Sequence, residues 1–213
     1  MNETKINETI IFREYKESDH FALSEIIRKT WQYDQLCSPK TAKKLSCTYL
    51  DCCLTDQTFT QVAVADGIPV GIIMGKNNRT HKCPLRFRLK LIKSAAMLFF
   101  SKEGRRISKI FSCVEDIDKN LQKNSPISYQ GEVTFFAIDS KFRGMGLGKK
   151  LFQSLQNYMK SENIHNFFLF TDTTCNYPFY EHQGMIRRGE QTHSFEISGP
   201  LRTQTLFIYD DQM

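Results

Sequence analysis

Apolar positions recur along this chain at two spacings, and each change of spacing marks an element. Residues 10–12 are a short apolar run typical of a strand, and "KESDHFALSEIIRKTW" after them repeats apolar residues at helical spacing. "SPKTAKKLSCTYLDCCL" predicts a second helix, because Ser38 suits the N-cap and Pro39 the first helical position. "TFTQVAVADGIPVGIIMGK" predicts two strands joined by a tight turn at Asp66–Gly67.

The C-terminal part alternates strands and helices. "GEVTFFAI" predicts a strand, "LGKKLFQSLQNYMKS" a helix and "NFFLFTD" another strand. A short helix at "YPFYEHQG" and strands near "MIRRGEQ" and "TQTLFIYD" complete the pattern. The chain is therefore predicted to be a mixed α/β protein without an internal repeat.

Residues 79–127 interrupt this alternation with a basic segment that is predicted to be helical. Five apolar residues lie on one helical stripe with basic residues between them: Leu85, Leu89, Ile92, Ala96 and Phe99. From Arg79 to Lys109 the sequence holds ten Lys or Arg residues and one acid, Glu103. The net charge of +6 is thus concentrated in this segment.

Composition narrows the class of protein. The 213 residues are 40% apolar and 12% aromatic, enough for a core in one domain. The first residues hold no long apolar run, and the longest such run, "SAAMLFFS", is far shorter than a bilayer span, so we expect a cytoplasmic protein. The seven cysteines show no Cys-x-x-Cys spacing, which predicts free thiols and no metal site.

A glycine-rich turn lies between the strand ending at Ile138 and the helix after it. Gly144, Gly146 and Gly148 occupy alternate positions there, with Lys149 following. The first N–H groups of a helix lack intrahelical partners and carry the positive end of its dipole, so this turn suits an anion such as a pyrophosphate. The spacing fits neither a G-x-x-x-x-G-K-S/T phosphate loop nor a G-x-G-x-x-G dinucleotide fingerprint. A turn that serves only backbone geometry stays an alternative.

Residues 131–185 resemble the GNAT superfamily of acyl-CoA N-acyltransferases. The family motif R/Q-x-x-G-x-G/A is present as Arg143-Gly144-Met145-Gly146-Leu147-Gly148, and "FTDTTCNYPFYEHQGM" is similar to the family's fifth strand and following helix. The resemblance implies a mostly antiparallel sheet of six to seven strands, splayed between strands 4 and 5, with helices on both faces. It also implies one domain over residues 1–213, with the helical insertion at about 79–127 between strands 3 and 4.

The resemblance implies acetyl-CoA as cosubstrate, and it implies which residues bind it. The pyrophosphate would lie against backbone amides of Arg143, Gly144, Met145, Gly146, Leu147, Gly148 and Lys149. The pantetheine arm would pair with the strand end at Phe136, Ala137 and Ile138. Asn176 would either bind the pantetheine amides or only cap the helix after it.

The implied reaction is direct attack of a primary amine, from a small molecule or a protein, on the thioester in a ternary complex. By the family motif, Tyr180 would protonate the leaving thiolate, with a packed aromatic residue whose hydroxyl is satisfied as the alternative. Glu132 would be the base, with solvation of an ordinary strand residue as the alternative. Asp172 is a weaker candidate, and His182 is expected to be an exposed polar residue.

The basic insertion leaves the identity of the amine that accepts the acetyl group undetermined, because neighbouring segments shape the acceptor cleft. It could be a lid or a dimer surface, it could bind an anionic acceptor or nucleic acid, or it could lie on an anionic membrane. A solvated helical cap packed on the core is the favoured interpretation. We therefore expect neither nucleic acid nor a membrane as partner, and a homodimer stays open. The alternative to an enzyme is a non-catalytic module that binds CoA or, through the insertion, a polyanion.

Overall fold

The computed structural model describes residues 9–196 and 201–212, and within them seven strands form one sheet in the order β1-β2-β3-β4-β5-β7-β6. The strands are β1 (Ile10–Arg13), β2 (Phe59–Ala65), β3 (Ile68–Asn77), β4 (Gly131–Ile138), β5 (Asn166–Asp172), β6 (Ile186–Glu196) and β7 (Leu201–Gln212). The helices are α1 (His20–Thr30), α2 (Pro39–Thr55), α3 (Leu85–Phe99), α4 (Lys102–Asn124), α5 (Leu147–Ser161) and α6 (Pro178–His182). The predicted mixed α/β class, the element order and the helical insertion between β3 and β4 are confirmed.

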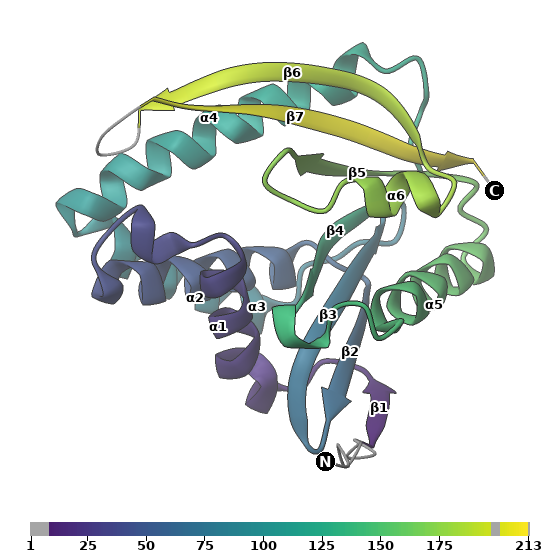
Figure 1. Ribbon diagram of the computed structural model, residues 1–213, viewed down its shortest axis with the longest axis horizontal. Helices are drawn as coiled ribbons and strands as arrows, with labels where there is room; N and C mark the ends of the chain where they lie inside the picture. The colour runs from purple at the N-terminus through teal and green to yellow at the C-terminus, as the bar shows by residue number, and fades with distance from the viewer. Residues whose placement is uncertain (1–8, 197–200, 213) are drawn as a thin grey trace, which may run out of the picture.

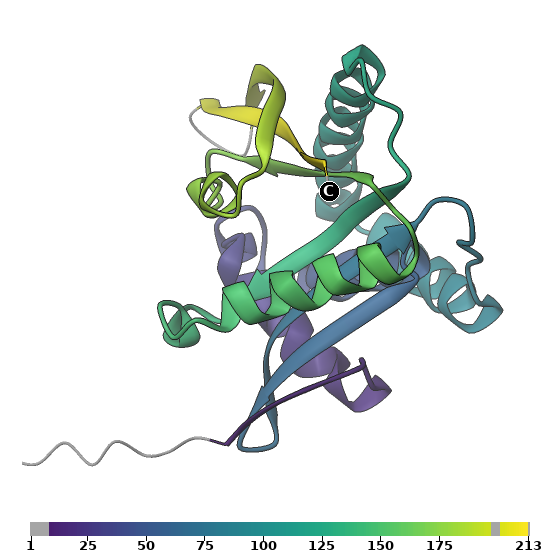
Figure 2. The same cartoon turned by 90° about the vertical axis from the view of Figure 1, so that its right-hand side faces the viewer.

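The sheet is divided between β4 and β5, as the resemblance implies. These two strands are parallel and pair only at Gly131–Phe167 and Glu132–Phe168, whereas all other neighbouring strands are antiparallel. Beyond Glu132 the two strands diverge (Figures 1 and 2). The result is a half-sheet of β1 to β4 and a half-sheet of β5, β7 and β6.

A bulge in β4 gives a physical reason for the divergence. In the pairing with β3, Gly75 lies opposite Val133 and Met74 opposite Phe135, so Thr134 is an extra residue. A bulge bends its strand and increases the local twist. This one follows directly after the last pair with β5, so the rest of β4 turns away from β5.

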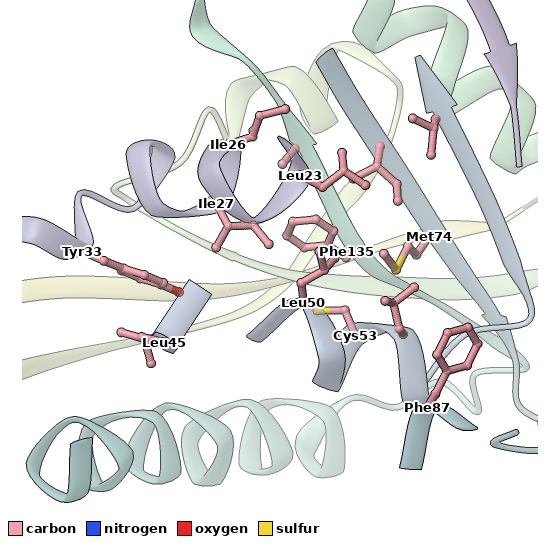
Figure 3. Close-up of a cluster of buried hydrophobic side chains, with 14 of the residues drawn as sticks. Leu23, Ile26, Ile27, Tyr33, Leu45, Leu50, Cys53, Met74, Phe87 and Phe135 are labelled. Carbon is pink, nitrogen blue, oxygen red and sulfur yellow. The ribbon is translucent and has the colours of Figure 1, made fainter. Parts of the chain in front are cut away.

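Helices cover both faces of the sheet. On one face, α5 buries Leu151 and Leu155 in a cluster that also holds Val133 of β4. On the other face, α1 and α2 form a second cluster, in which Phe135 of β4 lies near Leu23 and Ile27 of α1 (Figure 3). The bulge explains why Val133 and Phe135 lie on opposite faces despite their even spacing, since an extra residue inverts the alternation.

The insertion consists of α3 and α4, and α4 links the cluster of α1 and α2 to the half-sheet of β5, β7 and β6. Its first part places Ile107 in the cluster of α1 and α2. Its later part places Ile117 and Leu121 against Phe168 of β5 and Ile208 of β7. Figure 1 shows the long helix running beside β6 and β7. No helix in the described part of the chain is long and apolar enough to cross a membrane.

Candidate functional site

The three glycines of the turn before α5 serve two different purposes. Gly144 and Gly146 both have a φ of +79°, a conformation that favours glycine, and a Cβ on either would meet nothing within 4 Å. Gly148 is helical, and a Cβ there would lie 3.3 Å from the ring of Phe179. The first two therefore shape an open turn, while the third lets α6 approach α5.

A row of backbone donors faces outward at this turn. The first N–H of α5 with an acceptor is that of Lys150, which donates to the carbonyl of Gly146 at 3.2 Å. Across the described residues, the N–H groups of residues 144–149 have no acceptor. Arg143 and Lys149 are exposed beside them. A 15-residue helix with free leading donors and nearby cations is suited to hold a phosphate group.

The individual side chains of the turn are placed differently. Met145 is 52% exposed, whereas Leu147 is buried and packs with the α5 cluster. The guanidinium of Arg143 donates from Nε to the carbonyl of Ile138 at 3.4 Å. Arg143 also lines a cavity of about 220 Å³ together with Lys29 of α1. Two cations thus lie beside the turn, and Asp139 is the acidic residue of the same cavity.

The end of β4 offers a second set of backbone groups. Phe136, Ala137 and Ile138 pair with residues 71–73 of β3 along one edge. Along the other edge, pairing with β5 ends at Glu132, so this edge is open in the described part of the chain. An open strand edge can hydrogen-bond an extended ligand with amide groups. The edge leads directly into the turn before α5.

Tyr180 lies on α6 with its ring enclosed and its hydroxyl free of any partner among the described residues. The rings of Phe152 and Tyr209 lie 6.3 and 6.1 Å from its ring, centroid to centroid. Burial raises the pKa of Tyr180 well above its usual value, and the neighbouring Cys175 and Asp172 raise it further. The phenol therefore stays protonated at neutral pH and can donate a proton.

Asn176 and His182 flank Tyr180. The N-cap of α6 is Tyr177, and no side chain forms a cap hydrogen bond there, so the side chain of Asn176 does not cap the helix. It is exposed and makes no hydrogen bond with the described residues. The Nδ1–H of His182 donates to the carbonyl of Pro178 at 2.7 Å, and its ring is exposed. His182 is thus an exposed polar residue.

Glu132 lies on β4 at the point where pairing with β5 ends, and its side chain is 20% exposed. Burial raises the pKa of Glu132 to about 7; the ammonium of Lys76, at 3.7 Å, opposes the shift, and Asp56 adds to it. Lys76 itself lies closer to Asp56, at 2.7 Å. A carboxyl group with a pKa near neutrality is well matched to accept a proton at physiological pH.

Asp118 of α4 lies near Glu132 and was not predicted from the sequence. Burial raises the pKa of Asp118 to about 7, and the charges of Asp172 and Glu132 raise it further. Its Oδ1 atom is buried without a hydrogen-bond partner among the described residues. The oxygen of Asp172, in contrast, accepts from the N–H of Thr174 at 2.6 Å, so Asp172 stabilises its own turn. The insertion therefore contributes one carboxyl group, that of Asp118, near Glu132.

Aromatic side chains line the α1–α2 side of β4. The ring of Tyr49 lies 5.8 Å from that of Phe135, 5.9 Å from that of Trp31 and 6.1 Å from that of Phe111, measured between centroids. Trp31, Tyr49 and Phe111 are only partly buried. Aromatic faces attract cations, as do the carboxyl groups nearby.

The cysteines of the chain are free thiols, and the described residues contain no group of three or more His, Cys, Asp or Glu residues that could hold a metal ion. Cys175 lies beside the site, and burial raises the pKa of its thiol to about 11.

Comparison with known proteins supports the family resemblance and the fold. Residues 115–185 match the Acetyltransferase (GNAT) family, which confirms the resemblance seen in the motifs. No curated protein matches the sequence well enough to count as a relative. The fold is similar to that of PH1933 from Pyrococcus horikoshii OT3, with a TM-score of 0.60 and 15% identity over 96% of this chain and 99% of the other.

Two named acetyltransferases share the fold at low identity. An agmatine N-acetyltransferase variant in its apo form has a TM-score of 0.59 and 12% identity, covering 96% of this chain and 99% of its own. The ribosomal-protein-alanine N-acetyltransferase from Brucella melitensis has a TM-score of 0.56 and 15% identity, covering 95% and 99%. These likenesses concern the fold.

Proposed function

On the premise that residues 115–185 match the GNAT acetyltransferase family, we propose that this protein transfers an acetyl group from acetyl-CoA to a primary amine. The observation that carries the proposal is the continuity between the open edge of β4 and the row of free N–H groups at residues 144–149. A strand edge suits an amide-containing arm and a helix N-terminus suits a pyrophosphate, and CoA carries both.

The residues present fit CoA. The open space at Gly144 and Gly146, where a Cβ would meet nothing within 4 Å, leaves room for a phosphate to approach the backbone. The amides from Gly144 to Lys149 would hold the pyrophosphate, with the side chain of Arg143 beside them, since the N–H of Arg143 already donates to the carbonyl of Ser140. Phe136 to Ile138, with Asn176, would hold the pantetheine arm. When bound, acetyl-CoA supplies the activated acetyl group.

Two residues would move protons in a direct attack within a ternary complex. Glu132, with a pKa of about 7, would accept the proton that the amine loses. Tyr180, whose hydroxyl is protonated and unpartnered among the described residues, would donate a proton to the leaving sulfur. Glu132 lies at the last residue of β4 that pairs with β5, and Tyr180 lies on α6, which follows β5 in the chain.

The surroundings of Glu132 favour an acceptor that arrives as a cation. Asp118 adds a second carboxyl group near Glu132, and the partly exposed rings of Trp31 and Tyr49 lie on the same side of β4. A protonated amine on a small molecule or at the end of a peptide meets this description.

Isothermal titration with acetyl-CoA tests the cofactor. We expect micromolar binding by the wild-type protein and a loss of at least about tenfold in the Met145→Glu variant, since a carboxylate would then stand beside the phosphate turn. Met145 is 52% exposed and has no positive φ, so the substitution adds charge without backbone strain. Ile68→Glu, at a residue 63% exposed on β3, is the matched control. Absence of binding by the wild-type protein would contradict the proposal.

A screen for thiol release with an amine panel tests the reaction. The panel includes agmatine, phosphinothricin and alanine peptides, because agmatine, phosphinothricin and alanine occur in the names of proteins with this fold. Turnover with any amine supports the enzyme. Tight binding of acetyl-CoA without turnover, together with salt-sensitive binding of polyanions, would favour the non-catalytic alternative.

A further inference from the structure

Helix α3 of the insertion has two apolar faces, and only one of them is covered. Phe87, Ser94 and Leu98 are buried against the protein. The opposite face, here called the α3 stripe, consists of residues that sequence analysis placed together: Leu85, Leu89, Ile92, Ala96 and Phe99. All of them are exposed, Leu85 by 67% and Phe99 by 60%, and Phe100 directly after them by 84%.

Helix geometry shows how compact this second face is. At about 100° per residue, the α3 stripe spans an arc of about 80°, and the buried residues lie on the far side of the helix. The buried face is committed to the core, because Phe87 and Leu98 belong to the cluster of α1 and α2. Lys90 also fixes the helix, since its ammonium donates to Glu17 at 2.7 Å. The α3 stripe therefore cannot turn inward.

Basic residues flank the α3 stripe on both sides. By the same rotation Arg88 lies along one side, and Arg86 and Lys93 lie along the other. All three are exposed, and none has an acidic partner within the described ranges. The helix itself contains no acidic residue. Lys102 and Arg105 continue the basic surface beyond Phe100.

The charges decide which occupant fits this face. A second copy of the chain would bring two rows of Arg and Lys against each other. A surface of anionic lipids is complementary to both the apolar stripe and its basic flanks. The acyl chains would contact the α3 stripe, and the lipid phosphates would pair with the flanking Arg and Lys residues. An apolar hollow of about 410 Å³, lined by Ala96, Phe99 and Phe100 among others, adds room for a chain at the same end.

We propose that α3 docks the protein on an anionic membrane surface, with the helix in the plane of the interface and the α3 stripe among the headgroups and upper acyl chains. The expectation of no membrane partner rested on a helix packed on the core as a solvated cap. Helix α3 does pack on the core through Phe87 and Leu98, but the solvated face carries the apolar α3 stripe, and the proposal concerns that face. The proposal is independent of the acetyl transfer proposed above.

Co-sedimentation of the full chain with vesicles tests the docking. We expect binding to phosphatidylcholine vesicles that contain about one third phosphatidylglycerol, and little binding to phosphatidylcholine alone. The double variant Leu89→Glu/Ile92→Glu should bind at least about tenfold more weakly, because it places carboxylates in the stripe. Ile68→Glu is the apolar control, since Ile68 is 63% exposed on a different element.

The basic flank is tested separately. Arg88→Glu/Lys93→Glu should weaken binding and reduce its dependence on salt, whereas Lys123→Glu/Lys160→Glu, an equal change of charge at exposed positions on α4 and α5, should do much less. Equal losses in both pairs would mean that net charge alone attracts the protein, and would overturn the proposal. Binding that resists the glutamates in the stripe would overturn it as well.

Insertion depth separates docking from loose adsorption. The fluorescence of an Ile92→Trp variant should shift to the blue on adding anionic vesicles and be quenched by brominated acyl chains, relative to the wild-type protein with Trp31 alone. Folding of each variant is checked by its acetyl-CoA titration or circular dichroism. Absence of vesicle binding, or a wild-type dimer in solution that Leu89→Glu/Ile92→Glu separates, would assign the face to another occupant and contradict the proposal.

Discussion

At the scale of single residues, Glu132 combines a buried position with a nearby cation. Its pKa of about 7 predicts that kcat/KM rises with pH through that range, as Glu132 loses its proton. Glu132→Gln should lower kcat/KM by about 10²- to 10⁴-fold and remove this limb of the profile. Glu115→Gln, at an exposed residue of α4, is the control. An unchanged profile in Glu132→Gln would assign the base to another group.

Asp118 predicts how stability depends on pH. Its pKa of about 7 lies above the ordinary value of 3.8, so the folded state favours the protonated carboxyl. The stability that this provides is fully present below the ordinary pKa and is lost as pH rises through about 7. We expect the urea concentration at the unfolding midpoint to fall between about pH 4 and pH 7, and Asp118→Asn to reduce that fall. A fall of equal size in the variant would contradict this assignment.

Tyr180 is predicted to act on chemistry and not on binding. Removing its hydroxyl in Tyr180→Phe should lower kcat by about 10²-fold and leave the Kd of acetyl-CoA unchanged, since the ring contacts remain. Tyr177→Phe, one turn earlier on the same segment, is the matched control. Steady-state kinetics and titration with acetyl-CoA on both variants test this prediction. Equal effects of the two substitutions would indicate that Tyr180 only packs.

At the scale of elements, the glycine turn predicts two distinguishable variants. Gly146→Ala forces a side chain into φ +79° and should cost about 1 kcal/mol and weaken acetyl-CoA binding. Gly148→Ala adds a Cβ 3.3 Å from Phe179, next to Tyr180, and should lower kcat about three- to tenfold while the Kd of acetyl-CoA changes little. Titration and kinetics on both proteins check this. Similar profiles for the two variants would mean that the glycines share one role.

The turn also shows what the sequence could predict at this scale. The alternation of glycines before a helical pattern predicted the strand, the turn and α5 correctly, because all three signals are local. The role of Gly148 could not be predicted from the sequence, because it depends on close contact with Phe179, which lies far along the chain. The exposure of the α3 stripe was equally beyond reach, because periodicity identifies an apolar face without saying what covers it.

At the scale of the whole molecule, α4 connects two half-sheets that share only two residue pairs. Ile117 is 4% exposed against β5 and β7, and Ile117→Ala should cost about 2–5 kcal/mol of unfolding free energy. Amide hydrogen exchange should become faster in β6 and β7 than in β2 and β3, because the helix supports the second half-sheet. Ile68→Ala is the exposed control. Uniform acceleration throughout the sheet would show that the halves open as one unit.

The sequence predicted the arrangement of residues 131–185 in more detail than that of the insertion. The family motifs between residues 131 and 185 implied the splay, which the two-residue pairing confirms. They did not imply that the insertion bridges the halves or brings Asp118 to Glu132, because such contacts join segments with no shared pattern. The bulge at Thr134, which inverts the faces of β4, likewise depends on the partner strand.

The position of β7 between β5 and β6 has a consequence for biosynthesis. During translation β5 and β6 leave the ribosome before β7, yet they do not pair with each other, and each must wait for the later strand. The first half-sheet, with α1 to α3, can assemble while β5 and β6 still present unpaired edges and the apolar residues that α4 will cover. Nascent chains that stall before residue 201 should therefore be the species that chaperones bind.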